Sequence, residues 1–175
     1  MLTDLLLTHS NHLFQDPKQV QKMQPYPPLQ TMLVAAVLRQ AGLRVAICDT
    51  TFDDPRRAFL RAFEEHSPRQ VVVCEDSFNF LTKMCLTRNR ELACWMAQAA
   101  RTRGTPVAVH GSDASDHPLE YRNAGFDSVL RGAAEGAWWG AVVGSGAGQG
   151  AWIGAAAAPR GASSQYSSAA ARLYR

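Results

Sequence analysis

Short apolar runs alternate with longer amphipathic segments along the first 131 residues. The apolar runs lie near 4–8, 43–48, 70–75, 106–110 and 127–131, have the length of strands, and are rich in Val, Leu and Ile. Continuous apolar runs of this length are typical of strands that are buried on both faces. The pattern therefore favours a parallel sheet covered by helices on both sides.

The segments between these runs have helical spacing and clear ends. Apolar residues from Leu29 to Val37 recur at helical spacing and stop before Gly42. A second set around Phe59 does the same before Pro68. Both ends are of the kind expected for helices in a globular domain.

The remaining helices complete the alternation. The longest is predicted over 82–103, with Gly104 as its C-terminal cap, and a short one near 118–124 precedes Gly125. Strands alternating with helices imply right-handed crossovers and a parallel sheet. We expect a three-layer, doubly wound α/β domain over 1–135, with five parallel strands in flavodoxin-like, or Rossmann-like, order.

Composition changes after this domain. Residues 136–175 are dominated by Ala and Gly, with glycines at 136, 140, 144 and 148 in a small-xxx-small pattern. A membrane helix is disfavoured, because Ala and Gly contribute little transfer free energy and few large apolar residues are present. We expect a low-complexity, poorly ordered tail that does not span a membrane.

Polar or glycine-containing segments follow the predicted strands. If the strands are parallel, these segments share the carboxyl edge of the sheet, where open α/β sheets bind ligands. A stiff Pro-rich stretch before the first helix can form one wall of such a cleft. The candidate binding residues are Thr8, His9, Ser10, Tyr26, Pro27, Leu29, Glu75, Asp76, Ser77, Asn79, His110, Gly111, Ser112, Asp113, Arg131 and Gly132.

Each of these segments also has a simpler structural interpretation. The acids Glu75 and Asp76 can merely cap the next helix. The stretch from His110 to His117 contains two imidazoles and two carboxylates, but a metal site is disfavoured because helical i, i+4 ligand spacing and a third ligand group are missing. We expect instead that Gly111 permits close approach of a ligand and that Ser112 donates a hydrogen bond.

Charge and cysteine content narrow the class of protein. The formal net charge is +3 and the basic residues are dispersed, which gives nucleic-acid binding little support. No CxxC or CxxxCxxC motif occurs, so zinc and iron–sulfur sites are not encoded. The N-terminus lacks a basic leader and a long apolar core, so we expect a cytoplasmic protein. The four cysteines are interpreted as structural thiols: Cys48, Cys74, Cys85 and Cys94.

Common catalytic motifs are absent from the strand ends. No G-x-S-x-G elbow, G-x-G-x-x-G fingerprint or P-loop follows a predicted strand. A phospho-acceptor receiver domain is also disfavoured, because His9 and Arg131 stand where acidic residues and a lysine would be needed.

Taken in order, several fragments resemble the N-terminal cobalamin-binding domain of cobalamin-dependent radical S-adenosylmethionine enzymes. The resemblance spans about residues 1–135. The fragments are Pro25-Tyr26-Pro27-Pro28-Leu29, Gly42 with Val45 and Asp49, Gly111-Ser112-Asp113 with His117-Pro118, and Gly125 to Gly132. The segment from Glu75 to Cys85 also resembles a narrower subgroup of these proteins.

The resemblance implies that a corrinoid lies across the carboxyl edge of the sheet, contacting the candidate residues given above. The D-x-H-x-x-G motif that supplies a cobalt ligand in many cobalamin domains is absent. A cobalamin without a protein histidine ligand is therefore implied, which would suit methyl transfer.

Two departures from the family limit the expected function. The acidic Gly-Glu-x-Glu passage reads Gly132-Ala133-Ala134-Glu135, and the radical barrel with its cysteine motif is missing. We hypothesise that the tail is a truncated or frame-shifted remnant, and that a barrel, if used, is supplied elsewhere. The expected function is a non-catalytic corrinoid-binding module.

Two alternatives remain open at this point. One is a small hydrolase or transferase whose strand-end acid–base residues are His9, Glu75, Asp76, His110 and Asp113. The other is that the tail serves as an association or membrane segment.

Overall fold

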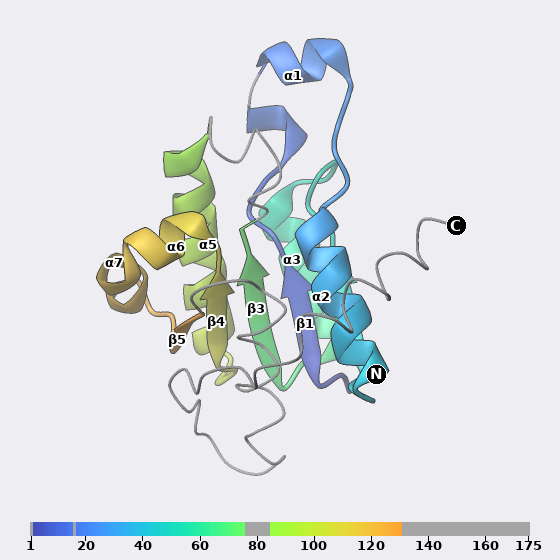
Figure 1. The fold of residues 1–175 in the computed structure, drawn as a ribbon, viewed down its shortest axis with the longest axis vertical. Helices are drawn as coiled ribbons and strands as arrows, with labels where there is room; N and C mark the ends of the chain where they lie inside the picture. Colours follow the sequence, from blue (N-terminus) through green and yellow to red (C-terminus); the bar gives the residue numbers. More distant parts are fainter. Residues whose placement is uncertain (1, 16, 76–84, 131–175) are drawn as a thin grey trace, which may run out of the picture.

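A computed structural model describes residues 2–15, 17–75 and 85–130 and contains one five-stranded parallel sheet (Figure 1). The strand order is β2-β1-β3-β4-β5, which confirms the flavodoxin-like order expected from sequence. Each strand lies within a predicted apolar run. The strands are β1 (Leu5–Thr8), β2 (Val45–Cys48), β3 (Gln70–Cys74), β4 (Val107–His110) and β5 (Ser128–Leu130).

Both faces of the sheet are buried, as the continuous apolar runs predicted. Alternate residues of each strand point to opposite faces, so Leu5 and Leu7 join one apolar cluster and Leu6 joins the other. In β3, Val72 belongs to the cluster of Leu5, whereas Val71 belongs to that of Leu6. Two separate apolar layers therefore hold the sheet between the helices.

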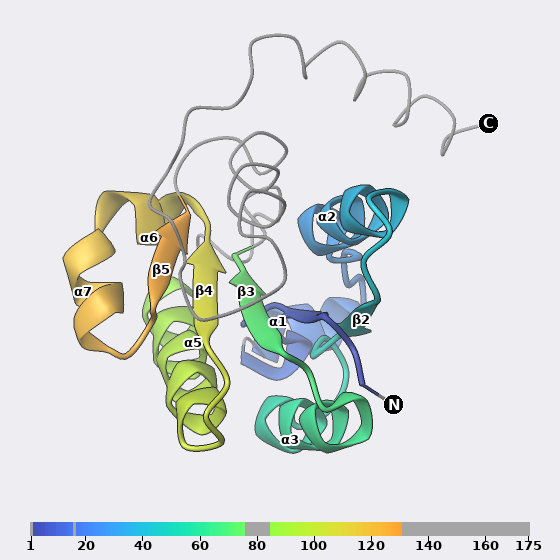
Figure 2. The same cartoon turned by 90° about the horizontal axis from the view of Figure 1, so that it is seen from below.

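The long helices lie in layers on either side of the sheet (Figure 2). Helix α2 (Leu29–Gln40) covers one face, and helices α3 (Pro55–His66) and α5 (Leu86–Arg101) cover the other. Helix α7 (Pro118–Asn123) lies beside β5, at the edge of the sheet. This arrangement confirms the predicted three-layer α/β architecture.

Local signals account for the helix ends. The Asp54 carboxylate accepts a hydrogen bond from the Arg57 amide at 2.8 Å, while Pro55 occupies the first turn of α3. At the other end, Ser67 adopts a left-handed conformation. Gly104 has a φ of +72° just past α5, as expected for its predicted capping role. The part of the predicted helix at 82–84 lies outside the described residues.

Three short helices occupy segments that the sequence predicted as loops. They are the 3₁₀-helix η1 (Leu13–Gln15), α1 (Pro17–Lys22) and α6 (Ser112–Asp116). Helix α1 has no buried residue, so it has no apolar stripe that sequence periodicity could detect. Helix α6 is only five residues long, which is too short to establish a period.

Two of the cysteines are buried in the sheet, as structural thiols would be. Cys48 lies in β2 and Cys74 in β3, while Cys85 and Cys94 are partly exposed. Burial raises the pKa of the Cys48 thiol to about 11, so it stays protonated and unreactive near neutral pH.

The predicted tail at 136–175 lies outside the described residues, as do 131–135 of the predicted domain. Within the described ranges, none of the helices is long and apolar enough to cross a membrane.

Candidate functional site

Because all five strands run in parallel, the segments that follow them meet at one edge of the sheet. In Figure 1 the strand arrows point toward the end of the molecule that carries α1. The order places the topological switch point between β1 and β3, where the connections leave toward opposite faces. The candidates Asp76, Ser77, Asn79, Arg131 and Gly132 lie outside the described residues.

The residues after β1 bind tightly to those after β2. The Thr8 hydroxyl donates to the Cys48 carbonyl at 3.1 Å. His9 is buried, and its Nε2 lies 3.0 Å from Asp49 Oδ1, while Thr50 contacts both ring nitrogens. The hydrogen bond from His9, together with those from Thr51, holds the pKa of Asp49 well below its usual range despite partial burial.

The 3₁₀-helix η1 is hydrogen-bonded to the loop that follows β1 and to the loop that follows β2. The Leu13 amide donates to the Thr51 carbonyl at 2.9 Å, and the Gln15 side chain donates to the Ser10 carbonyl at 3.2 Å. Arg88, in the first turn of α5, donates to the Gln15 carbonyl at 2.5 Å. Ser10 is buried, with η1 bonded to its carbonyl, and Arg88 links η1 to α5.

Two buried polar side-chain atoms have no hydrogen-bond partner among the residues that the structure describes. They are Oε1 of Gln15 and Oγ1 of Thr31, and both residues are more than nine-tenths buried. Thr31 lies in the first turn of α2, one turn before Val34 and Ala35, which pack in the apolar cluster of that face. An unpaired buried polar group costs about 1–3 kcal/mol. An ordered water or a polar group of a ligand can satisfy each of these atoms.

The Nδ1 atom of His12 is also buried, and it has no partner within the described part of the chain. Its side chain as a whole is partly exposed, and burial lowers the pKa of its imidazole against the opposing effect of Asp54. The ring is therefore neutral near neutral pH.

Several large apolar side chains at this end of the molecule are exposed. Phe14 lies in η1 and Phe52 follows β2, and the hydrogen bond between Leu13 and Thr51 holds these two segments together. Tyr26 and Pro27 are exposed before α2, and Leu29, its first residue, is partly buried. The Pro-rich stretch thus stands at the edge where sequence predicted a cleft wall.

His110, the last residue of β4, faces α2. Its Nδ1 accepts a hydrogen bond from the Gln30 side chain at 2.8 Å, and both residues are buried. This contact joins β4, on one side of the switch point, to α2, the helix that follows β1 on the other side. The enclosed imidazole is held in the protein interior.

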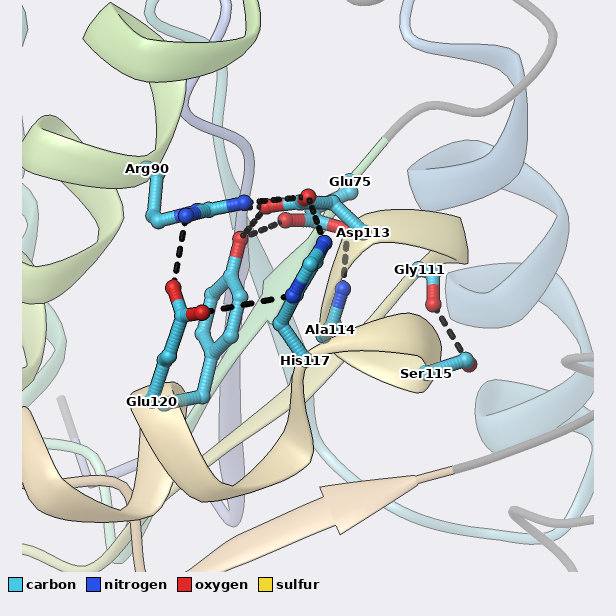
Figure 3. Close-up of polar contacts among 9 residues, drawn as sticks. Glu75, Arg90, Gly111, Asp113, Ala114, Ser115, His117 and Glu120 are labelled. Atoms are coloured by element: carbon cyan, nitrogen blue, oxygen red, sulfur yellow. Dashed lines mark hydrogen bonds and ion pairs between the residues drawn. The ribbon is translucent and has the colours of Figure 1, made fainter.

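Glu75 and Asp113 come together around one tyrosine (Figure 3). The Tyr121 hydroxyl contacts Oε1 of Glu75 and lies 2.7 Å from Oδ2 of Asp113. Arg90 binds Asp113 through two hydrogen bonds of 2.8 and 2.6 Å, and also reaches Glu120 at 2.6 Å. This cluster, which is buried at Glu75, Asp113 and Tyr121, ties the end of β3 to α5, α6 and α7.

The pKa values of the two carboxyl groups in this cluster are shifted in opposite directions. Burial raises the pKa of Glu75, although hydrogen bonds from Tyr121 and Ala114 oppose the rise. Burial also acts on Asp113, but Arg90 and Tyr121 outweigh it and lower the pKa of Asp113. Burial and the adjacent Glu75 raise the pKa of Tyr121, so its hydroxyl remains protonated.

Gly111 is needed here for a contact within the protein. A Cβ at this position would lie less than 3 Å from three atoms of Glu75, including the Cβ of that residue. The Glu75 side chain therefore fills the space that the missing side chain leaves. Whether a ligand also approaches Gly111, as the sequence suggested, stays a prediction.

The next residue, Ser112, begins α6 and is exposed. The hydroxyl that bonds locally is that of Ser115, which donates to the Gly111 carbonyl at 2.6 Å. A ligand contact of Ser112 also stays a prediction.

Sequence reasoning missed the partners that define these clusters. Arg90 is 23 residues from Asp113, and Gln30 is 80 residues from His110. No local pattern connects residues so far apart. The sequence shows only a Tyr and an Arg on predicted helices, and neither signal is specific.

Comparisons with known proteins give no family for the chain: no protein-family model matches it, and no curated protein matches it.

Proposed function

We propose that residues 1–135 form a corrinoid-binding module whose ligand lies across the carboxyl edge of the sheet. The observation that carries the proposal is the pair of buried, unpartnered atoms, Gln15 Oε1 and Thr31 Oγ1. Gln15 lies in η1, which is bonded to the loop after β1, and Thr31 lies in the first turn of α2, the helix that leads from β1 to β2. The order of the family-like fragments along the chain adds support from sequence.

The chemistry of a corrinoid fits these orphan groups. The corrin periphery carries amide side chains, which offer N–H donors and carbonyl acceptors. An amide N–H can satisfy Gln15 Oε1, and an amide carbonyl can accept from the Thr31 hydroxyl. Binding would therefore recover hydrogen bonds that the free protein lacks.

The exposed apolar side chains support the same proposal. Phe14 and Phe52 project from adjoining segments at this edge, and Tyr26 lies in the Pro-rich stretch. A flat, largely apolar macrocycle can cover such side chains and remove them from water. The residues proposed to hold the ligand are therefore of two kinds: buried side chains with polar atoms, and large side chains with apolar surface exposed to solvent.

Three of the five histidines agree with binding without a protein ligand to cobalt. His9 and His110 are buried and engaged by Asp49 and Gln30. His66 lies at the opposite end of the sheet, because its carbonyl accepts from the Thr3 amide ahead of β1. When bound, methylcobalamin supplies a transferable methyl group, while the chain binds and orients it. A radical S-adenosylmethionine barrel that uses this group would lie outside the 175 residues of this sequence.

The direct test is retention of hydroxocobalamin by the full chain after incubation and desalting. We expect a coloured protein with a corrinoid absorbance spectrum. A colourless protein would remove the proposal.

His12→Ala tests the absence of a histidine ligand, because His12 has an unpartnered ring nitrogen in the loop after β1. We expect the spectrum of the bound corrinoid to be unchanged by this variant, and a shift would show that His12 ligates cobalt.

A matched pair of threonine variants tests the site itself. Thr31→Val removes the orphan hydroxyl while keeping the shape, so the free protein should be as stable as before or more so. Corrinoid affinity should fall about tenfold, as expected for one lost hydrogen bond of roughly 1.4 kcal/mol. Thr105→Val changes another buried threonine, before β4 at the opposite edge, and should leave affinity unchanged. Equal affinity in both variants would exclude Thr31 from the site.

Fewer observations support the alternative function, a small acid–base enzyme. Of its described residues, His9 contacts Asp49, His110 contacts Gln30, and only Glu75 and Asp113 come together. Both of these carboxyl groups are buried around Tyr121. Loss of substrate turnover on His110→Ala would be the result that favours the enzyme.

A further inference from the structure

A half-exposed carboxylate, that of Asp49, directly follows β2 at the carboxyl edge of the sheet. Its Oδ1 accepts a hydrogen bond from the Thr51 amide at 2.9 Å and lies 3.0 Å from Nε2 of His9. The side chain of Asp49 is 50% exposed, whereas that of His9 is only 2% exposed. The imidazole therefore holds the carboxylate from within the protein, while a ligand at this edge can reach it from outside.

The segment that carries this carboxylate is anchored to the loop after β1. The Thr50 hydroxyl lies 2.8 Å from the His9 carbonyl and 3.1 Å from the Asn11 carbonyl. The Leu13 amide donates to the Thr51 carbonyl at 2.9 Å. Because these contacts fix the segment in one position, the carboxylate needs little reorganisation when a ligand binds.

Hydrogen bonds keep the Asp49 carboxyl group ionised. The bond from His9 lowers the pKa of Asp49 well below its ordinary value of 3.8; burial opposes this effect, and bonds from Thr51 add to it. An ionised carboxylate is only an acceptor, and its hydrogen bonds with neutral donors are stronger than those between neutral groups. It also repels a second negative charge. Asp49 thus offers an acceptor that favours an uncharged donor over an anion.

Two exposed aromatic rings adjoin this carboxylate. Phe52 is three residues after Asp49, and Phe14 follows Leu13, whose amide bonds to the Thr51 carbonyl. Phe52 is 56% exposed and Phe14 is 54% exposed. A ligand that fits both features has a large apolar face bordered by hydrogen-bond donors. A corrin ring with amide side chains around its periphery has this combination.

We propose that Asp49 accepts a hydrogen bond from a side-chain amide of the corrin, and that its charge selects corrinoids with amides over corrinoids with carboxylates. This inference rests on the proposed function, since it names the ligand group that one residue of the same site recognises. His9 is a positioning residue: it orients the carboxylate and is itself buried.

The test measures dissociation constants of the full chain by absorbance titration with cobinamide and cobyrinic acid. Cobinamide keeps the corrin amides but lacks the nucleotide of cobalamin, whereas cobyrinic acid carries carboxylates in place of the amides. We expect wild type to prefer cobinamide, and Asp49→Asn to reduce the ratio of the two dissociation constants roughly tenfold. Because both corrinoids are measured on the same variant, any loss of folded protein cancels in the ratio.

Asp53→Asn is the matched control. It removes one negative charge four residues away, from a carboxylate that Arg57 and Arg61 already bind at 3.1 Å each. We expect this variant to keep the wild-type ratio. An equal ratio in wild type and Asp49→Asn would overturn the proposal while leaving the corrinoid-binding module intact. If wild type bound neither these corrinoids nor hydroxocobalamin, the proposed function would fail together with this inference.

The nucleotide of cobalamin offers ribose hydroxyls as a different kind of donor. Loss of affinity in Asp49→Asn for hydroxocobalamin, with unchanged affinity for cobinamide, would identify the nucleotide as the donor and would also overturn the proposal.

A second measurement needs no variant. In wild type labelled with ¹³C at aspartate carboxyl carbons, the Asp49 signal should shift when cobinamide binds, whereas the Asp53 signal should stay in place. An Asp49 signal that does not move when the protein is saturated with cobinamide would contradict the assigned contact.

Discussion

At the scale of single residues, the buried side chains at the strand ends determine which residue types can pack against them. Glu75 requires a glycine opposite it, because its side chain fills the place of a Cβ on Gly111. The acid also lies against Tyr121, which holds it to Asp113. A ligand-binding loop was expected from sequence, and the structure adds a packing role for the same residues.

Replacing Gly111 with alanine should be strongly destabilising. The new methyl group would overlap the Glu75 side chain, and overpacking of this kind costs about 1–3 kcal/mol or more. Chemical denaturation would measure the loss. Gly42→Ala is the control, since a Cβ there meets nothing within 4 Å and faces only the strain of a φ of +85°, roughly 1–2 kcal/mol. A smaller effect at Gly111 than at Gly42 would contradict the packing role.

The residue scale also separates what was predictable from what was not. Glu75 and Asp113 were identified because acids follow predicted parallel strands, and strand ends meet at one edge. Their partners Arg90 and Tyr121 come from helices distant in sequence. Which helix faces carry them depends on three-dimensional packing, and a single sequence contains no local sign of that.

At the scale of elements, capping and periodicity set the long helices, whereas short helices depend on their surroundings. Helix α3 has both an apolar stripe and a capping aspartate. Helices α1 and α6 have six and five residues, too few to be stable alone. Sequence therefore predicted the former and left the latter as loops.

The Asp54 cap should contribute measurably to stability. Asp54→Ala removes the acceptor of the Arg57 amide and should lower the free energy of unfolding by about 1 kcal/mol. Asp54→Ser keeps a capping oxygen and serves as the control, with most of that stability retained. Circular dichroism during urea unfolding would give both values. Equal losses in the two variants would argue against a capping role.

At the scale of the whole molecule, the strand order creates the candidate edge. The chain leaves β1 toward α2 on one face and leaves β3 toward α5 on the other, so the connections diverge at the switch point between these strands. The orphan atoms of Gln15 and Thr31 lie in segments beside that divergence. The proposed corrinoid site is thus a property of topology as well as of residue type.

A corrinoid that binds the folded chain must also stabilise it. At a hundredfold excess over Kd, hydroxocobalamin should raise the free energy of unfolding by about 2.7 kcal/mol. Thermal unfolding with and without the corrinoid would measure this as an increase in Tm, and Thr31→Val should need more ligand for the same increase. An unchanged Tm at saturating ligand would count against binding to the native state.

The sequence by itself determined the class of fold, because strands buried on both faces and helices with caps leave periodic patterns that a single chain displays. It also determined that polar loops would share one edge, since parallel strands all end there. Only the tertiary structure decided which side chains meet: Tyr121 with Glu75, Gln30 with His110, and η1 over Ser10. These contacts depend on the packing of elements far apart in the chain, and burial, which arises only on folding, makes Glu75 a stronger binder of its proton.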